Sequence, residues 1–256
     1  MRVTILGSGT SHGVPSIGCG CEVCTSPDPR DRRTRCSILV EWRGQSLLVD
    51  TAPELRQQVI RSHVRRVDAI LLTHSHADHI FGMDDVRRFN EMQAGEMPVF
   101  GRTDTLRDVR RSFQYVFVPT QVGGGKPRLE LTEIEGETLR FRDLRIEAIP
   151  VFHGKLEVTA FRFADFAYVT DTSEIPERSM ERLRGLDTLI LDGLRWEPHP
   201  THFSIDQALE VVERLRPRRT FLTHIAHTVA HAEAERRLPD GVRLAYDGLI
   251  LEVPDA

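Results

Sequence analysis

Three histidines and an aspartate lie within six residues, directly after an apolar stretch. Residues 73–79 read THSHADH, and the apolar run 69–72 (AILL) precedes them. Imidazole nitrogens and carboxylate oxygens are ligands that Zn, Mn, Fe and Ni accept. Four ligands at two spacings are more than one open catalytic metal needs. The pattern therefore predicts a site for two metal ions, and a solvated loop that happens to be rich in histidine is the alternative.

A second cluster places three thiols in the six residues 19–24 (CGCEVC). The chain has four cysteines, and no hydrophobic signal segment precedes residue 19. This favours a reducing compartment, where clustered cysteines bind metal rather than form disulfides. Three thiolates need a fourth ligand to close a structural zinc site. The candidates are Cys36, His227 and His231, although Cys36 begins an apolar strand and is better explained as a core residue.

The composition indicates one globular domain. The 256 residues are 40% hydrophobic and 28% charged, enough to bury a sizeable core. No apolar run approaches the roughly 20 residues that cross a bilayer. The net charge of −4 provides no overall attraction to nucleic acid. We therefore expect a cytoplasmic protein with no membrane or nucleic-acid partner, and a homodimer is left open.

The elements that must position these clusters alternate along the chain. We expect strands at 1–7, 37–42, 46–49, 69–72, 98–101, 129–134, 138–149, 158–163, 166–170, 187–191, 219–223 and 242–252. Helices are expected at 80–92, 103–111, 176–184 and 204–215, and another opens with Pro53 in its first turn. Ser204 is the expected N-cap of the helix at 204–215.

The run H-x-H-x-D-H is typical of the metallo-β-lactamase superfamily, which the chain resembles from end to end. The resemblance implies a four-layer αββα sandwich of the α+β/α/β class, with metals at one edge of two sheets, formed by residues 1–256 as a single domain. Three further segments match the superfamily's ligand positions. His153 ends 149–153 (IPVFH), Asp171 follows 166–170 (FAYVT), and His224 ends 220–224 (TFLTH).

The resemblance assigns these residues to two divalent ions, Zn or Mn. It implies that one ion is held by His74, His76 and His153, the other by Asp78, His79 and His224, and that Asp171 bridges them. Two such ions, roughly 3.5–4 Å apart, share a hydroxide and clamp the oxygens of an in-line displacement. Asp78 therefore also counts as catalytic. Asp50 matches a carboxylate that orients the metal loop, and a helix N-cap is the alternative reading of it.

The cysteine cluster resembles that of one branch, the phosphoribosyl cyclic phosphodiesterases of the carbon–phosphorus lyase pathway (PhnP). In that branch the fourth zinc ligand is a histidine three residues after the last catalytic histidine. The match here is His227, which implies a structural zinc on Cys19, Cys21, Cys24 and His227 in the loop 19–24. The branch also shows His-x-Lys-Leu at 153–156, which makes Lys155 a candidate for binding substrate phosphate.

The resemblance favours a phosphodiesterase. Phosphodiesterases of the superfamily keep a non-ligand histidine just before the helix at 204–215, and His202 matches it as a general acid. We expect a dinuclear metallohydrolase acting on a small cyclic or nucleotide-like phosphodiester. A hydrolase of a lactone, carboxylic ester or thioester is the first alternative. A non-catalytic cofactor-binding protein of the PQQ-biosynthesis type is the second.

Two segments leave the substrate open. Residues 196–200 (WEPHP) differ from the carbon–phosphorus lyase enzyme, so the pocket can differ while the metal chemistry is kept. Gly123–Gly125 are three consecutive glycines whose dihedrals little constrains. A loop that covers the substrate and a plain surface connection are both compatible with them.

Overall fold

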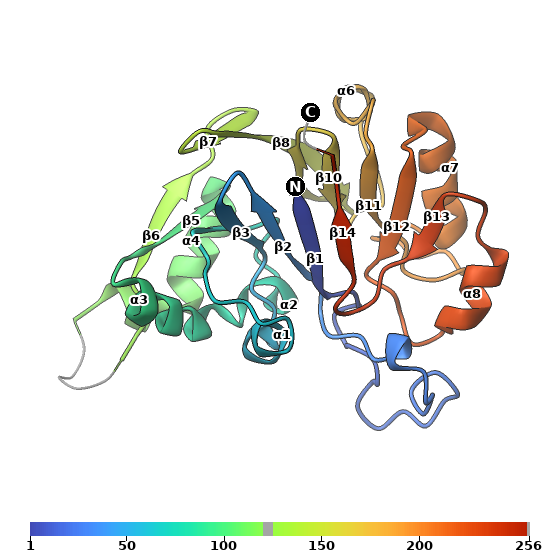
Figure 1. Ribbon diagram of the computed structural model, residues 1–256, viewed down its shortest axis with the longest axis horizontal. Helices are drawn as coiled ribbons and strands as arrows, with labels where there is room; N and C mark the ends of the chain where they lie inside the picture. The colour runs from blue at the N-terminus through green and yellow to red at the C-terminus, as the bar shows by residue number, and fades with distance from the viewer. Residues whose placement is uncertain (120–124, 255–256) are drawn as a thin grey trace.

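Two seven-stranded β-sheets pack against each other in the computed structural model, which describes residues 1–119 and 125–254 (Figure 1). In spatial order the first sheet contains β14 (Ile250–Glu252), β1 (Arg2–Gly7), β2 (Ser37–Trp42), β3 (Gln45–Val49), β4 (Ala69–Leu71), β5 (Met97–Gly101) and β6 (Leu129–Glu133). The second contains β13 (Val242–Leu244), β12 (Arg219–Thr223), β11 (Thr188–Asp192), β10 (Phe166–Val169), β9 (Leu156–Phe163), β8 (Leu144–His153) and β7 (Thr138–Phe141).

Helices cover the outer face of each sheet. The first sheet is flanked by α1 (Leu55–Arg61), α2 (Ala77–Ile80), α3 (Arg87–Gln93), α4 (Thr103–Ser112) and α5 (Gln114–Phe117), with the short 3-10 turn η2 (Met83–Val86). The other 3-10 turn, η1 (Pro29–Asp31), precedes β2, and its Asp31 accepts from the backbone N–H of His231 at 2.8 Å. The second sheet is flanked by α6 (Glu177–Arg182), α7 (Ile205–Leu215) and α8 (His231–Arg237). Among the described residues, none of these helices has the length and apolarity that a bilayer span requires.

Three apolar clusters define the four layers. The central one joins side chains of both sheets, such as Val40 of β2 and Phe161 of β9. A second lies between the first sheet and its helices and includes Ile70 and Phe89. The third lies beneath α6, α7 and α8. The alternation of buried residues along the strands therefore produces the αββα sandwich that the sequence predicts.

Several expected elements differ from the structure. The strand expected at 138–149 is a hairpin of β7 and β8, turned at Arg142 in the left-handed region (φ 53°). The strand expected at 242–252 is two strands that belong to different sheets. The helix expected at 80–92 is interrupted at Gly82, where an added Cβ would lie 2.0 Å from the carbonyl oxygen of Ala52.

Two helix predictions also need correction. Helix α1 begins at Leu55 with Glu54 as its N-cap, so Pro53 precedes the helix instead of lying in its first turn. Helix α8 was not expected from the sequence. By contrast, Ser204 caps α7 as expected and forms a capping box with Gln207. Of the three-glycine segment, residues 123 and 124 lie outside the described residues.

Candidate metal centres

The predicted ligands follow the ends of strands at one edge of the two sheets. In the second sheet β10, β11 and β12 are parallel, so their carboxyl ends meet at that edge. Asp171 follows β10, Asp192 ends β11 and His224 follows β12. The histidine motif follows β4 of the first sheet, and the backbone N–H of Thr159 in β9 donates to Thr73 O at 2.9 Å. The two sheets are thereby joined at the metal motif.

Four of the predicted ligands form a compact group. Donor atoms of Asp78, His79, Asp171 and His224 all lie within 4.8 Å of one another. His79 Nε2 is 3.3 Å from both Asp78 Oδ2 and Asp171 Oδ1. His224 Nε2 is 3.3 Å from Asp171 Oδ2 and 3.8 Å from Asp78 Oδ2. Mixed carboxylate and imidazole donors at these separations suit one divalent ion.

The other three predicted ligands are next to this group. Ring centroids of His74 and His76 are 4.6 Å apart, and those of His76 and His153 are 5.2 Å apart. His74 Nε2 is also 3.9 Å from Asp171 Oδ2. Asp171 therefore lies between the two groups, where a carboxylate could bridge two ions.

The chemistry of the donors fits divalent ions. The Nε2 atoms of His74, His79 and His224 are buried, and within the described chain they have no hydrogen-bond partner. A buried polar atom without a partner costs free energy, so unpartnered nitrogens beside carboxylates fit a cation between them. Asp171 and His224 also hold left-handed backbone (φ 51° and 62°), which surrounding contacts must stabilise.

The electrostatics of the centre also fit a bound cation. Burial lowers the pKa of His79, but the carboxylates of Asp171, Asp50 and Asp78 outweigh it and hold this pKa well above its ordinary value. His224 is similarly buried, yet Asp171 and Asp78 raise its pKa to about 9. The carboxylates thus concentrate negative potential that a proton or a metal ion can neutralise.

Asp50 braces the metal motif. One carboxylate oxygen accepts from the backbone N–H of Thr73 at 2.8 Å, and the other lies 2.7 Å from His79 Nδ1. This contact leaves Nε2 of His79 facing the centre, as an orienting partner of a metal-binding histidine would. Asp50 does not cap α1, whose N-cap is Glu54.

His202 is next to the same centre and is held by a residue that the sequence did not single out. Its Nδ1 lies 2.7 Å from Asp192 Oδ2, an oxygen that also accepts from Thr172 N at 2.7 Å. The ring of His202 is 4.4 Å from that of His224 and 4.5 Å from that of His153. Asp192 ends β11 at the same sheet edge as Asp171, and this position is the signal that could have identified it.

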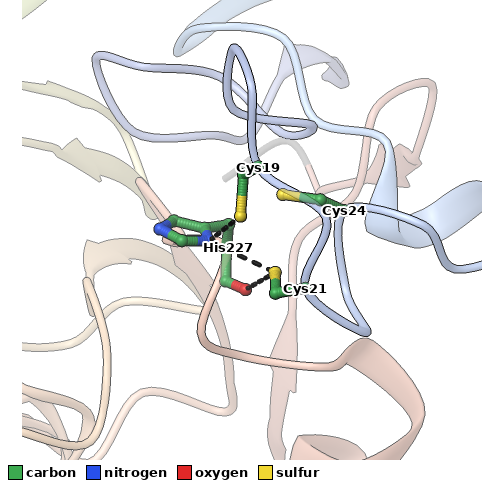
Figure 2. A group of neighbouring side chains, drawn as sticks. All are labelled: Cys19, Cys21, Cys24 and His227. Carbon is green, nitrogen blue, oxygen red and sulfur yellow. Dashed lines mark hydrogen bonds between the residues drawn. The ribbon is translucent and has the colours of Figure 1, made fainter.

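The cysteine cluster forms a second centre, shown in Figure 2. Donor atoms of Cys19, Cys21, Cys24 and His227 lie within 4.8 Å of one another. His227 Nδ1 is 3.5 Å from Cys19 Sγ and 3.4 Å from Cys21 Sγ. The hydrogen bond from His227 lowers the pKa of Cys21 to about 6, which favours the thiolate that metals bind. Three sulfurs and one nitrogen are the donors of a closed zinc site.

The other candidates for the fourth ligand lie elsewhere. Cys36 is fully buried, with its Sγ 3.4 Å from Gly9 O and from Thr223 Oγ1. It is a core cysteine, as expected. The ring of His231 packs edge-on against Tyr246.

A buried arginine joins the two centres. The Arg33 guanidinium donates to Ala226 O at 3.1 Å and to Val229 O at 2.8 Å, on either side of His227 in sequence. It also pairs with Asp31 at 2.9 Å, and both side chains are almost wholly buried. The turn that carries ligands of both centres is therefore fixed to the segment after the cysteine loop.

Lys155 is exposed in the turn between β8 and β9, two residues after His153. Its predicted contact with phosphate stays a prediction. The ring of His199 is 5.2 Å from that of His202.

The model of the β-lactamase superfamily domain matches residues 45–225, which include every strand-end ligand described above. The chain belongs to this superfamily. The match confirms the resemblance stated from the H-x-H-x-D-H motif.

A solved structure described as a new diphosphatase from the PhnP family is 43% identical, with a TM-score of 0.92, covering 99% of this chain and 98% of that one. An octanoyltransferase of Porphyromonas gingivalis is 35% identical over 97% of this chain but only 51% of its own length. The chain thus spans about half of that relative. Coenzyme PQQ synthesis protein B of Methylobacterium nodulans is 35% identical over 75% of this chain and 73% of its own.

Proposed function

We propose that this protein is a dinuclear metallohydrolase that cleaves a small phosphodiester, either cyclic or nucleotide-like. The observation that carries the proposal is the proximity of the seven predicted metal ligands to one another and to the His202–Asp192 pair. Similarity over the whole chain to a PhnP-family diphosphatase supports the phosphorus chemistry. The cofactors we propose are two divalent ions, Zn or Mn, and a separate structural Zn.

The residues of the site would have separate roles in catalysis. When bound, two divalent ions would supply a water-derived nucleophile near neutral pH and neutralise the phosphoryl oxygens. His202 would donate a proton from Nε2 to the departing alkoxide, because its Nδ1 is engaged by Asp192. Asp192 would hold the ring in place and stabilise its protonated form. Lys155 would attract the substrate's phosphate as a point charge.

A turnover screen of Mn- and Zn-loaded protein tests the proposal. Bis-p-nitrophenyl phosphate and cyclic phosphates would be compared with lactones and thioesters. We expect phosphodiester turnover to dominate. Asp171→Ala should abolish it and lower the metal content, with an unchanged circular dichroism spectrum.

Three outcomes would contradict the proposal. Faster turnover of lactones or thioesters would favour a carboxylic ester hydrolase, for which His202 is not needed as an acid. No turnover of any panel by fully loaded protein would favour a cofactor-binding role like that suggested by the name of the PQQ synthesis relative. Full activity of protein that binds only one ion per catalytic centre would refute the dinuclear mechanism itself.

A further inference from the structure

An exposed aromatic patch lies beside the histidine motif, and the proposed mechanism does not use it. Phe81 is 55% exposed and follows α2, and its ring contacts that of Phe113 edge-on at 6.0 Å. Tyr115, 40% exposed, follows Phe113 and donates its hydroxyl to Asp84. Contiguous exposed apolar surface often marks a binding site.

The position of Phe81 links this patch to the candidate metal centre. Its backbone N–H donates to Ala77 O at 3.1 Å, so Ala77 and Phe81 share one exposed face of α2. His76, a predicted ligand that is itself exposed, immediately precedes that face. At ~1.5 Å of rise per residue, Phe81 is about 7.5 Å along the helix axis from His76.

Helix α4 is also connected to the metal motif. Ser75, between two predicted ligands, donates its hydroxyl to Asp108 of α4 at 2.7 Å. Arg111 is three residues after Asp108, and residues at this spacing share a helix face. Arg111 is exposed, and the structure pairs it with no carboxylate among the residues it describes. A cation is thus available on the face of α4 that meets the metal motif.

We infer that Phe81, supported by Phe113, is the base-stacking surface of a subsite for a nucleoside, and that Arg111 contacts a phosphate adjoining the scissile one. The inference rests on the proposed phosphodiesterase and narrows its substrate class to nucleotides. A ring held at its edge by another ring leaves one face free for stacking. Stacking accepts any base, so the subsite would select for a nucleoside but not for the identity of its base.

The first test compares two substrates with the same leaving group. These are p-nitrophenyl thymidine 5′-phosphate, which has a base, and methyl p-nitrophenyl phosphate, which has none. Phe81→Ala should lower kcat/KM for the thymidine ester by about 5- to 150-fold and change that of the methyl ester little. Phe81→Trp should retain the activity. Met92→Ala, which removes an exposed apolar side chain from α3, is the matched control and should change neither.

Binding without turnover gives an independent readout. Calorimetry on metal-loaded protein should show tighter binding of thymidine 5′-monophosphate than of ribose 5-phosphate, and Phe81→Ala should remove the difference. Arg111→Gln should weaken the binding of thymidine 5′-diphosphate more than the binding of thymidine 5′-monophosphate.

The outcomes separate this inference from the proposed function. Equal losses on both esters, no loss on either, or a change in oligomeric state on Phe81→Ala would overturn the nucleoside subsite, the last by pointing to a protein interface. A wild type that hydrolyses neither ester but discriminates the two monophosphates would contradict the phosphodiesterase and retain the subsite. A wild type that hydrolyses both esters equally well and does not discriminate the two monophosphates would support the phosphodiesterase and contradict the nucleoside subsite.

Discussion

Replacing His202 with alanine should slow phosphodiester hydrolysis in a way that depends on the leaving group. His202 is almost fully buried, and Asp192 fixes its Nδ1 at 2.7 Å. A proton donor held this firmly should contribute the full range typical of general acids, about 10²–10⁴-fold. We therefore expect that loss in kcat for a methyl leaving group, which departs as a strongly basic alkoxide.

The loss should shrink toward unity for a p-nitrophenyl leaving group, because that anion departs without a proton. The assay is a kcat comparison of alkyl and p-nitrophenyl esters of the same phosphate. The His202 ring is close to those of His153 and His224, so metal content must be measured in the same samples. His199→Ala is the matched control, since it removes a neighbouring imidazole that has no carboxylate partner among the described residues.

Asp192→Asn distinguishes the acid role from simple positioning. The amide can keep a hydrogen bond to His202 but cannot stabilise the protonated ring, so the alkyl ester should again lose more. Equal losses for both leaving groups, with metals retained, would refute the general-acid reasoning and indicate that His202 positions the substrate. An unchanged rate on every ester would remove His202 from the mechanism.

The remaining predictions concern stability. Cys21→Ser should remove one zinc per chain and lower the melting temperature, whereas His76→Ala should mainly remove activity; equal melting curves for the two variants would contradict a structural zinc. Arg33→Met should cost about 3–5 kcal/mol of unfolding free energy, because it leaves the Asp31 carboxylate buried and unpaired, and a second change, Asp31→Asn, should restore part of it in urea titrations. Burial holds the pKa of His231 near 4 instead of 6.5, so the unfolded chain binds more protons between these values and stability should fall as pH drops from 6.5 to 4. His231→Phe should flatten that dependence, and an unaltered slope would exclude His231 as its cause.

The sequence predicted the residues of the centres better than the partners of those residues. A histidine motif after an apolar strand is local, so THSHADH could be identified without a structure. The His202–Asp192 contact joins the ends of a strand and a loop ten residues apart, and no local pattern marks Asp192 as a partner. Arg33 is 193 and 196 residues from Ala226 and Val229, which it contacts, so no local pattern could indicate these partners.

The errors in the fold have a similar origin. Residues 242–252 alternate like one strand, but the pattern does not say which sheet a strand joins, and Gly248 (φ 89°) turns the chain from one sheet to the other. Gly82 lies near the start of the helix expected at 80–92, and one glycine disfavours a helix by only about 1 kcal/mol. Its interruption depends on the close approach of Ala52 to Gly82, which only tertiary packing determines. Helix α8 (HAEAERR) is short and polar, so no apolar stripe announced it.

The pairing of β1 with β14 has a consequence for biosynthesis. Val3 pairs with Leu251, so β1 acquires one of its two neighbours only after residue 251 has left the ribosome. Until then an apolar strand edge of β1 stays open, and open edges invite pairing with other chains. Similarly, the loop 19–24 lacks its predicted fourth zinc ligand until His227 has been synthesised. We therefore expect nascent chains halted before residue 227 to need chaperones, and a metal-starved cell to accumulate protein whose loop 19–24 is still unattached.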